Sequence, residues 1–166
     1  MIDKKQFKEM INEVTDYLGI QSKAGTNLLL GTAAQESGFG TYFKQIGGGP
    51  ALGIFQMEPK THMDLHLNYI HGREDRFSFL YDDWVTFPAV RLEWNLKYAI
   101  IMARIHYLRV PEALPKADWI YDNTDNKKPH PLWIEDMANY YKQYWNTYLG
   151  KSTVDKAVKA DNKYCL

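Results

Sequence analysis

The sequence predicts a single, mainly α-helical domain, and three observations lead to this fold class. Apolar residues recur at helical spacing along most of the 166 residues, strand signals are almost absent, and no internal repeat divides the chain. This length suits one domain with a core and a cleft, without disulfides, since the chain has one cysteine, Cys165. We expect at most a very small β element, close to Gly53–Met57.

Two helices are expected in the first 40 residues. Asp3 is suited to cap the first, whose apolar residues recur at helical spacing until Gly19 ends it. Ser22 is suited to cap the second, which is apolar on most sides and runs to Glu36 before Gly38 stops it. The second helix is therefore expected to be buried and to carry an acidic residue in its last turn.

The middle of the chain predicts two more helices. Pro59 is well placed as the first residue of a helix over residues 59–70 that closes at Gly72. A longer helix is expected from Pro88 to about Val110, because apolar residues form one stripe there and Pro111 stops it. The signals between these two helices are weak.

The last third of the chain begins with a predicted loop. Residues 121–131 (YDNTDNKKPHP) are polar and rich in helix breakers, which favours a surface loop. Pro131 is suited to open the last long helix, lined by aromatic residues up to Gly150. A short terminal helix is expected after Ser152 or Thr153.

Charge and composition exclude some classes of partner. The 20 basic and 20 acidic residues balance, so we expect no nucleic acid as the main ligand. No apolar run is long enough for a membrane span, and the start MIDKKQFKEM lacks the apolar core of a signal peptide. The 5 Trp, 12 Tyr and 7 Phe suit a carbohydrate cleft as well as a packed core.

Glu36 is the residue with the clearest chemical potential. It ends an apolar helix, where the negative pole of the helix dipole and apolar neighbours both favour the protonated form. A carboxyl group whose pKa is raised in this way suits general acid catalysis near neutral pH. An ordinary surface glutamate in the last helical turn is the alternative explanation.

Two histidines, His62 and His66, have the four-residue spacing of a helical zinc site. Met63 stands where a HExxH metalloprotease needs its glutamate, and no third ligand is evident. We therefore expect no metal and expect both histidines to face solvent.

Two short motifs carry a resemblance to a known family. The segment QESGFG at residues 35–40 resembles the Glu-Ser motif of lytic transglycosylases and goose-type lysozymes, and GIFQM at residues 53–57 resembles their Gly-Leu-Met-Gln-Ile motif. The resemblance implies a lysozyme-like fold in which Glu36 is the catalytic acid and Ser37 helps to hold it. It also implies that Gln56, with Gly53 and Phe55 of the same motif, lines the sugar groove.

The third motif of that family, Ala-Tyr-Asn-x-Gly, places a tyrosine against the catalytic glutamate, and this chain matches it imperfectly. Residues 138–141 (ANYY) and 144–147 (YWNT) are two possible registers. They leave Tyr140, Tyr141 and Tyr144 open as the supporting residue, with Asn146 as a further substrate contact. Residues 137–150 and 101–111 are also loosely similar to small lysozyme-like proteins of bacteriophages.

The resemblance implies cleavage of the β-1,4 bond between N-acetylmuramic acid and N-acetylglucosamine in peptidoglycan glycan strands, without a cofactor. The transglycosylase route is favoured because it needs one carboxylic acid, whereas an inverting hydrolase needs a second about 6.5–9.5 Å away. Glu58 is the candidate second carboxylate and substrate contact, although it also suits the cap of the following helix. A non-catalytic, glycan-binding component of a phage virion is the third alternative.

The same resemblance implies where the protein is made and acts. We expect synthesis in the cytoplasm of a bacterial host, without a signal peptide. Action on the cell wall would follow release, or the protein would act as a virion component beside other virion proteins.

Overall fold

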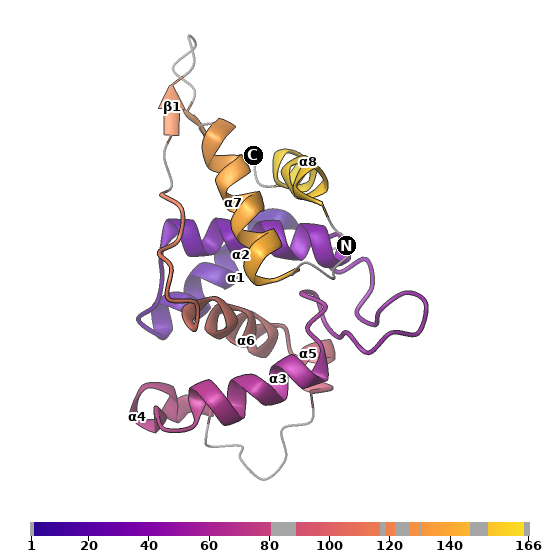
Figure 1. The fold of residues 1–166 in the computed structure, drawn as a ribbon, viewed down its shortest axis with the longest axis vertical. Helices are drawn as coiled ribbons and strands as arrows, with labels where there is room; N and C mark the ends of the chain where they lie inside the picture. Colours follow the sequence, from indigo (N-terminus) through magenta and orange to yellow (C-terminus); the bar gives the residue numbers. More distant parts are fainter. Residues whose placement is uncertain are drawn as a thin grey trace.

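Helix α2 (Lys23–Ser37) lies at the centre of the fold, beside α1 (Lys4–Tyr17) (Figure 1). The Ser22 side chain accepts a hydrogen bond from the Gly25 backbone N–H at the start of α2, and Gly38 ends the helix in the left-handed conformation. Ten of its fifteen residues are buried, because it is apolar on most sides. The first two predicted helices and their caps are confirmed.

The computed structural model describes residues 2–80, 89–116, 119–121, 127–129, 131–146 and 153–164. These residues form eight α-helices and one two-stranded sheet, so the prediction of a mainly α single domain is confirmed. One cluster of buried apolar side chains joins the helices, drawn from α1, α2, α6 and α7 among others.

The third predicted helix is present but changes type along its length. Helix α3 (Pro59–Leu65) begins at the predicted proline and continues as a π-helical turn, η1 (His66–Ile70). The chain then forms two short helical pieces, α4 (Glu74–Phe77) and η2 (Ser78–Leu80).

The predicted continuous helix over residues 88–110 is wrong, because Asn95 interrupts it. Helix α5 (Arg91–Trp94) and helix α6 (Leu96–Leu108) flank Asn95, whose backbone is extended. The Asn95 side chain accepts a hydrogen bond from the Tyr98 N–H and caps α6, an arrangement that asparagine favours over a helix interior. The predicted start at Pro88 lies outside the described residues.

Two small β elements occur among the described residues. Leu52 forms isolated antiparallel bridges with Met57 and Lys44, which places a very small β element where the sequence predicted one. The loop predicted over residues 121–131 is wrong in part, because β1 (Trp119–Tyr121) pairs antiparallel with β2 (Lys127–Pro129). The pairing runs from Trp119 opposite Pro129 to Tyr121 opposite Lys127, and β1 projects beyond the helices in Figure 1.

Helix α7 (Pro131–Tyr144) and helix α8 (Val154–Tyr164) pack on each other, and α8 also packs on α2. Helix α7 starts as predicted but ends before Gly150: the backbone N–H groups of Trp145 and Asn146 both bond to the Tyr141 carbonyl, where the helical repeat is lost. Residues 147–150 lie outside the described part of the chain. The terminal helix is confirmed.

His62 and His66 do not both face solvent, so this expectation is wrong. The side chain of His62 is 3% exposed, and its Nε2 lies 2.6 Å from the Tyr98 hydroxyl. His66 Nε2 lies 3.1 Å from the same hydroxyl. The two histidines share one tyrosine because α3 packs against α6.

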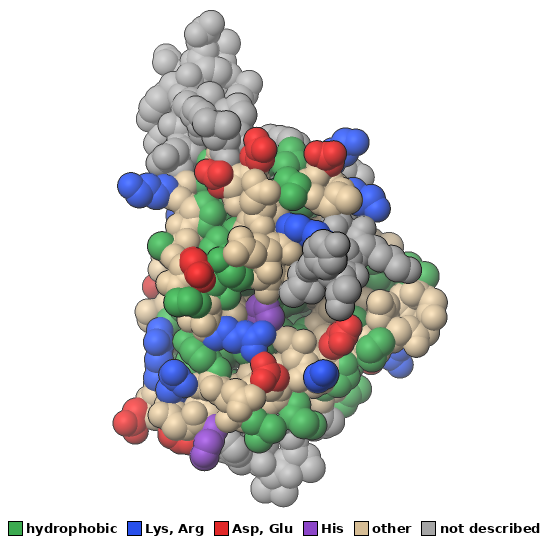
Figure 2. All heavy atoms as spheres, viewed as in Figure 1, with side chains coloured by type: hydrophobic (Ala, Val, Ile, Leu, Met, Phe, Trp, Pro, Cys, Tyr) green, Lys and Arg blue, Asp and Glu red, His purple; other side chains and the backbone are tan. Residues whose placement is uncertain are grey.

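The surface drawn in Figure 2 mixes acidic and basic side chains and shows no large area of a single sign. This distribution agrees with the balanced composition. Within the described ranges, every helix is too short or too polar to cross a bilayer.

Candidate active site

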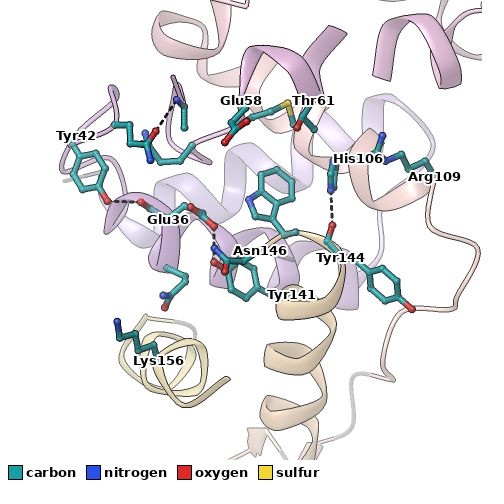
Figure 3. A pocket seen from close by; sticks show the side chains of 16 residues that line it. Glu36, Tyr42, Glu58, Thr61, His106, Arg109, Tyr141, Tyr144, Asn146 and Lys156 are labelled. Atoms are coloured by element: carbon teal, nitrogen blue, oxygen red, sulfur yellow. Dashed lines mark hydrogen bonds between the residues drawn. The ribbon is translucent and has the colours of Figure 1, made fainter. Parts of the chain in front are cut away.

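A cleft of about 780 Å³ opens beside the end of α2. Its walls come from the end of α2, the loop before α3, the start of α3, the end of α6, the end of α7 and helix α8 (Figure 3). The volume lies in the range of sites that enclose a small ligand or a few units of a polymer. Of the predicted site residues, Glu36, Gln56, Glu58, Tyr141, Tyr144 and Asn146 line it.

Glu36 lies in the last turn of α2 and is half-buried, not fully exposed. Burial raises the pKa of its carboxyl group from the ordinary value of 4.5 to about 7, against the opposing effect of hydrogen bonds from Tyr141 and Asn146. The group therefore exchanges its proton near neutral pH. An acid in a cleft with this pKa is able to donate a proton to a ligand and to take one back.

Two tyrosines hold Glu36 in place. The Tyr141 hydroxyl donates a hydrogen bond of 2.6 Å to Glu36 Oε1, and the Tyr42 hydroxyl donates one of 2.6 Å to the Glu36 backbone carbonyl. Burial and the nearby Glu36 charge raise the pKa of Tyr42. Figure 3 shows Tyr141 and Asn146 pointing toward the Glu36 side chain.

The three candidate tyrosines of α7 have different surroundings. Tyr141 bonds to Glu36, whereas the Tyr140 hydroxyl donates to the Glu112 carbonyl at 3.0 Å. Tyr144 lines the cleft, and its hydroxyl accepts a hydrogen bond of 3.0 Å from Gln143. The geometry therefore selects Tyr141 from the three alternatives that the sequence left open, and it places Tyr140 away from the carboxyl group.

Ser37 supports the site through the backbone and is fully buried. Its hydroxyl donates to the Ile54 carbonyl at 2.6 Å and accepts a hydrogen bond of 2.9 Å from the Gly40 N–H. These bonds tie the end of α2 to the segment over residues 53–57. The resemblance implied that this serine helps to hold the acid; in the structure its bonds reach the neighbouring loop.

The residues of the second motif divide between cleft and core. Gln56 lines the cleft; its Nε2 donates to the Gly53 carbonyl at 2.8 Å, and its buried Oε1 has no hydrogen-bond partner among the described residues. Gly53 and Phe55, both expected to contact substrate, do not line the cleft. Phe55 instead is buried in the core, where its ring packs against Phe7 and Trp145.

Gly53 has a structural role that only glycine fills. Its φ is +75°, and a Cβ at this position would lie 2.1 Å from the Leu92 carbonyl oxygen. The turn that carries Gln56 to the cleft therefore depends on a residue without a side chain.

Glu58 occupies the N-cap position of α3, but its side chain makes no capping hydrogen bond. The side chain is exposed and borders the cleft in Figure 3. Glu58 therefore stands at the N-cap position without capping α3 through its side chain, and that side chain lines the cleft.

Several cleft residues were missed in the sequence. Trp145 packs against His106 with ring centroids 4.6 Å apart, and both line the cleft. Burial lowers the pKa of His106 to about 4. Its Nε2–H donates to the Tyr144 carbonyl at 2.8 Å, because a carbonyl oxygen only accepts. Other missed cleft residues are Gln35, Tyr42, Gln45, Ala51, Met57, Thr61, Arg109 and Lys156.

The signal that would have found these residues was available only in part. Trp145 lies within the aromatic helix predicted up to Gly150, next to the predicted contact Asn146, although the observed helix ends at Tyr144. Arg109 lines the cleft at the end of α6, where it pairs with Asp64 of α3, and no local sequence signal predicts this long-range contact. Within the described residues, no three His, Cys, Asp or Glu side chains converge in a way that could hold a metal ion.

Comparison of this chain with protein-family models, with curated proteins and with solved structures found no match. Its class is therefore defined by its own fold and site: a mainly α domain with a cleft lined by aromatic side chains and by Glu36, whose pKa burial raises to about 7.

Proposed function

We propose that this protein cleaves the glycan strands of peptidoglycan at the β-1,4 bond between N-acetylmuramic acid and N-acetylglucosamine, as a lytic transglycosylase of lysozyme-like fold. Glu36 is the proposed acid and base, and Tyr141 and Asn146 hold its carboxyl group. Gln56, Trp145 and the other cleft residues are the proposed sugar contacts.

The observation that carries this proposal is the environment of Glu36. Its carboxyl group has a pKa of about 7, it borders a cleft of about 780 Å³, and a tyrosine from a distant helix bonds to it at 2.6 Å. The two motifs at residues 35–40 and 53–57 meet at this point, since Ser37 bonds to Ile54. The resemblance in sequence and the arrangement in space support the same site.

The proposed reaction needs one carboxyl group. Protonated Glu36 donates its proton to the glycosidic oxygen as the bond from that oxygen to the anomeric carbon breaks. The C6 hydroxyl of the same N-acetylmuramic acid then attacks the anomeric carbon and gives its proton to the Glu36 carboxylate. The products are a free N-acetylglucosamine end and a 1,6-anhydro sugar, and no water is consumed.

A Glu36→Gln variant assayed on purified cell walls tests the proposal. We expect loss of muropeptide release with a retained fold, because glutamine has a similar shape but cannot donate the proton. Release at the wild-type rate would eliminate Glu36 as the acid. Binding of chitin oligomers by the wild type without any muropeptide release would favour the non-catalytic virion component instead.

A hydrolase is the second candidate, because Glu58 lines the same cleft with a side chain that makes no capping bond. In this alternative Glu58 directs a water molecule to the anomeric carbon. Mass spectrometry separates the two routes, since a 1,6-anhydro product weighs one water less than the hydrolysed one. A Glu58→Gln variant would abolish hydrolysis but would leave anhydro products from a transglycosylase.

The proposed setting is a bacterial host infected by a phage. The protein would act on the wall after release from the host cytoplasm, or as part of the particle. This setting rests on the loose similarity of residues 137–150 and 101–111 to phage proteins. Detection of the protein in purified particles, or its absence from them, would decide between the two settings.

A further inference from the structure

Lys142, in the last turn of α7, contacts the residue that lies beside the proposed acid. Its Nζ donates to Asn146 Oδ1 at 3.0 Å and to the Asn146 backbone carbonyl at 3.0 Å. The Asn146 side chain in turn hydrogen-bonds to the carboxyl group of Glu36. The three side chains therefore form a series from Lys142 through Asn146 to Glu36.

The chemistry of the two ends of an amide determines the direction of this series. A lysine ammonium group has only donors, so the amide oxygen is the end that can face Lys142. The amide nitrogen, which has only donors, then faces Glu36. Rotating the Asn146 amide by half a turn would place its N–H groups against the ammonium group, with no acceptor between them.

We propose that Lys142 is a positioning residue that orients the Asn146 amide so that Asn146 can only donate a hydrogen bond to Glu36. The catalytic meaning of this arrangement rests on the proposed function, but the arrangement itself does not. Lys142 is not one of the cleft-lining residues, and it acts through Asn146.

This orientation has a direct consequence for the proton on Glu36. A donating amide stabilises the carboxylate, whereas a rotated amide would accept a hydrogen bond from the protonated carboxyl group and stabilise that form instead. Without Lys142 both orientations are open to Asn146. The protonated form of Glu36 would then be favoured, its pKa would rise, and the acid would be a weaker donor of the proton that the glycosidic oxygen receives.

The other groups that hydrogen-bond to Glu36 belong to residues that Lys142→Met does not change. Tyr141 bonds to the carboxyl group from α7, and Tyr42 bonds to its backbone from the loop after α2. The charged and titratable cleft residues beyond them are Glu58, His106, Arg109, Tyr144 and Lys156. A shift in the titration of Glu36 on removing Lys142 therefore reports on Asn146 or on the charge of Lys142 itself.

The test is the titration of the Glu36 carboxyl carbon by ¹³C NMR in the whole protein, without substrate. Lys142→Met should raise the midpoint by about one pH unit, since a hydrogen bond to a charged group has about this effect. Lys142→Arg keeps the donors and should titrate as the wild type does. Lys159→Met, which removes an exposed lysine from α8, is the matched control and should cause no shift.

Two further variants separate positioning from a direct effect of charge. Asn146→Leu should raise the midpoint by itself, and adding Lys142→Met to it should cause no further shift. Equal, additive shifts would overturn the proposal, because Lys142 would then act without Asn146. An unchanged midpoint in Lys142→Met would overturn it as well.

The wild type offers a measurement that does not depend on a variant folding. The side-chain amide protons of Asn146 should show nuclear Overhauser effects to the Tyr141 ring that are stronger than those to Lys142 Hε. The reverse order would overturn the proposed orientation. None of these measurements needs turnover, so they test Lys142 even if the protein cleaves no glycan. If the wild type cleaves cell walls but Lys142→Met leaves the Glu36 midpoint unchanged, only the positioning role of Lys142 is refuted.

Discussion

The hydroxyl of Tyr141 donates a 2.6 Å hydrogen bond to Glu36 Oε1 and so joins two residues that are 105 positions apart in the chain. The bond connects the last turn of α2 to the last turns of α7. It opposes the effect of burial on the carboxyl group, because it stabilises the charged form. The balance of these two effects leaves the Glu36 pKa at about 7.

Removal of this hydroxyl should move the titration of Glu36. In Tyr141→Phe we expect the pKa of Glu36 to rise by about one pH unit, since a hydrogen bond to a charged group is worth about 1.5–3 kcal/mol. The alkaline limb of the pH profile of kcat/KM on cell walls should shift upward with it. Tyr140→Phe, on the same helix but bonded to the Glu112 carbonyl, is the control. Equal profiles for the two variants would contradict the assignment of Tyr141.

The raised pKa of Glu36 also makes stability depend on pH. The folded protein holds a proton between pH 4.5 and about 7 that the unfolded chain has released, so the free energy of unfolding falls as the pH rises through this window. The loss is about 3 kcal/mol at most, at about 1.4 kcal/mol per pH unit. Glu36→Gln should remove this dependence. The free energy of unfolding should then fall between pH 5 and pH 8 in the wild type by more than it does in the variant.

Urea denaturation at several pH values measures this effect. Glu135→Gln, which changes an exposed glutamate on α7, serves as the control and should follow the wild type. A wild type and a Glu36→Gln variant whose unfolding free energies run parallel from pH 5 to pH 8 would show that the carboxyl group is not protonated in this range.

Local signals made the elements around Glu36 predictable. Ser22 and Gly38 define the ends of α2 by capping chemistry that depends only on neighbouring residues. Asn95 shows where such reading failed: the apolar stripe continues through it, but its side chain caps α6 and splits the expected helix. Apolar residues at helical spacing indicate that one face of a segment is buried. They do not indicate whether the backbone is interrupted within that segment.

The sequence reduced the candidates for the tyrosine that bonds to Glu36 to three, but it could not decide among them. Tyr140 and Tyr144 are four residues apart and share one face of α7, with ring centroids 4.5 Å apart, while Tyr141 is turned by about 100°. The helical period therefore separates Tyr141 from the other two. Which face meets α2 depends on the packing of α7, and no local signal contains that information.

Gly53 should tolerate no side chain. In Gly53→Ala the new Cβ would lie 2.1 Å from the Leu92 carbonyl oxygen at a φ of +75°, so we expect a loss of more than about 3 kcal/mol. Gly47→Ala is the matched control, because its φ is +90° but nothing lies within 4 Å of the new Cβ. Its cost should stay near 1–2 kcal/mol, the strain alone. Thermal unfolding of both variants measures the difference, and equal losses would show that the Leu92 contact relaxes.

Ser37 should contribute to the shape of the cleft as well as to stability. In Ser37→Ala the buried Gly40 N–H loses its acceptor and the Ile54 carbonyl loses a donor, at a cost of about 1–3 kcal/mol. The segment that presents Gln56 would no longer be tied to the end of α2, so cleavage of cell walls should fall even where the variant is fully folded.

Thr41→Ala is the control, because it removes an exposed hydroxyl bonded to the Gly38 carbonyl. It should cost less than about 1 kcal/mol without this loss of activity. Chemical denaturation and wall digestion below the unfolding transition measure the two effects. Full activity in a destabilised Ser37→Ala would show that the serine contributes to stability only. The position of Gln56 would then not depend on the bond between Ser37 and the Ile54 carbonyl.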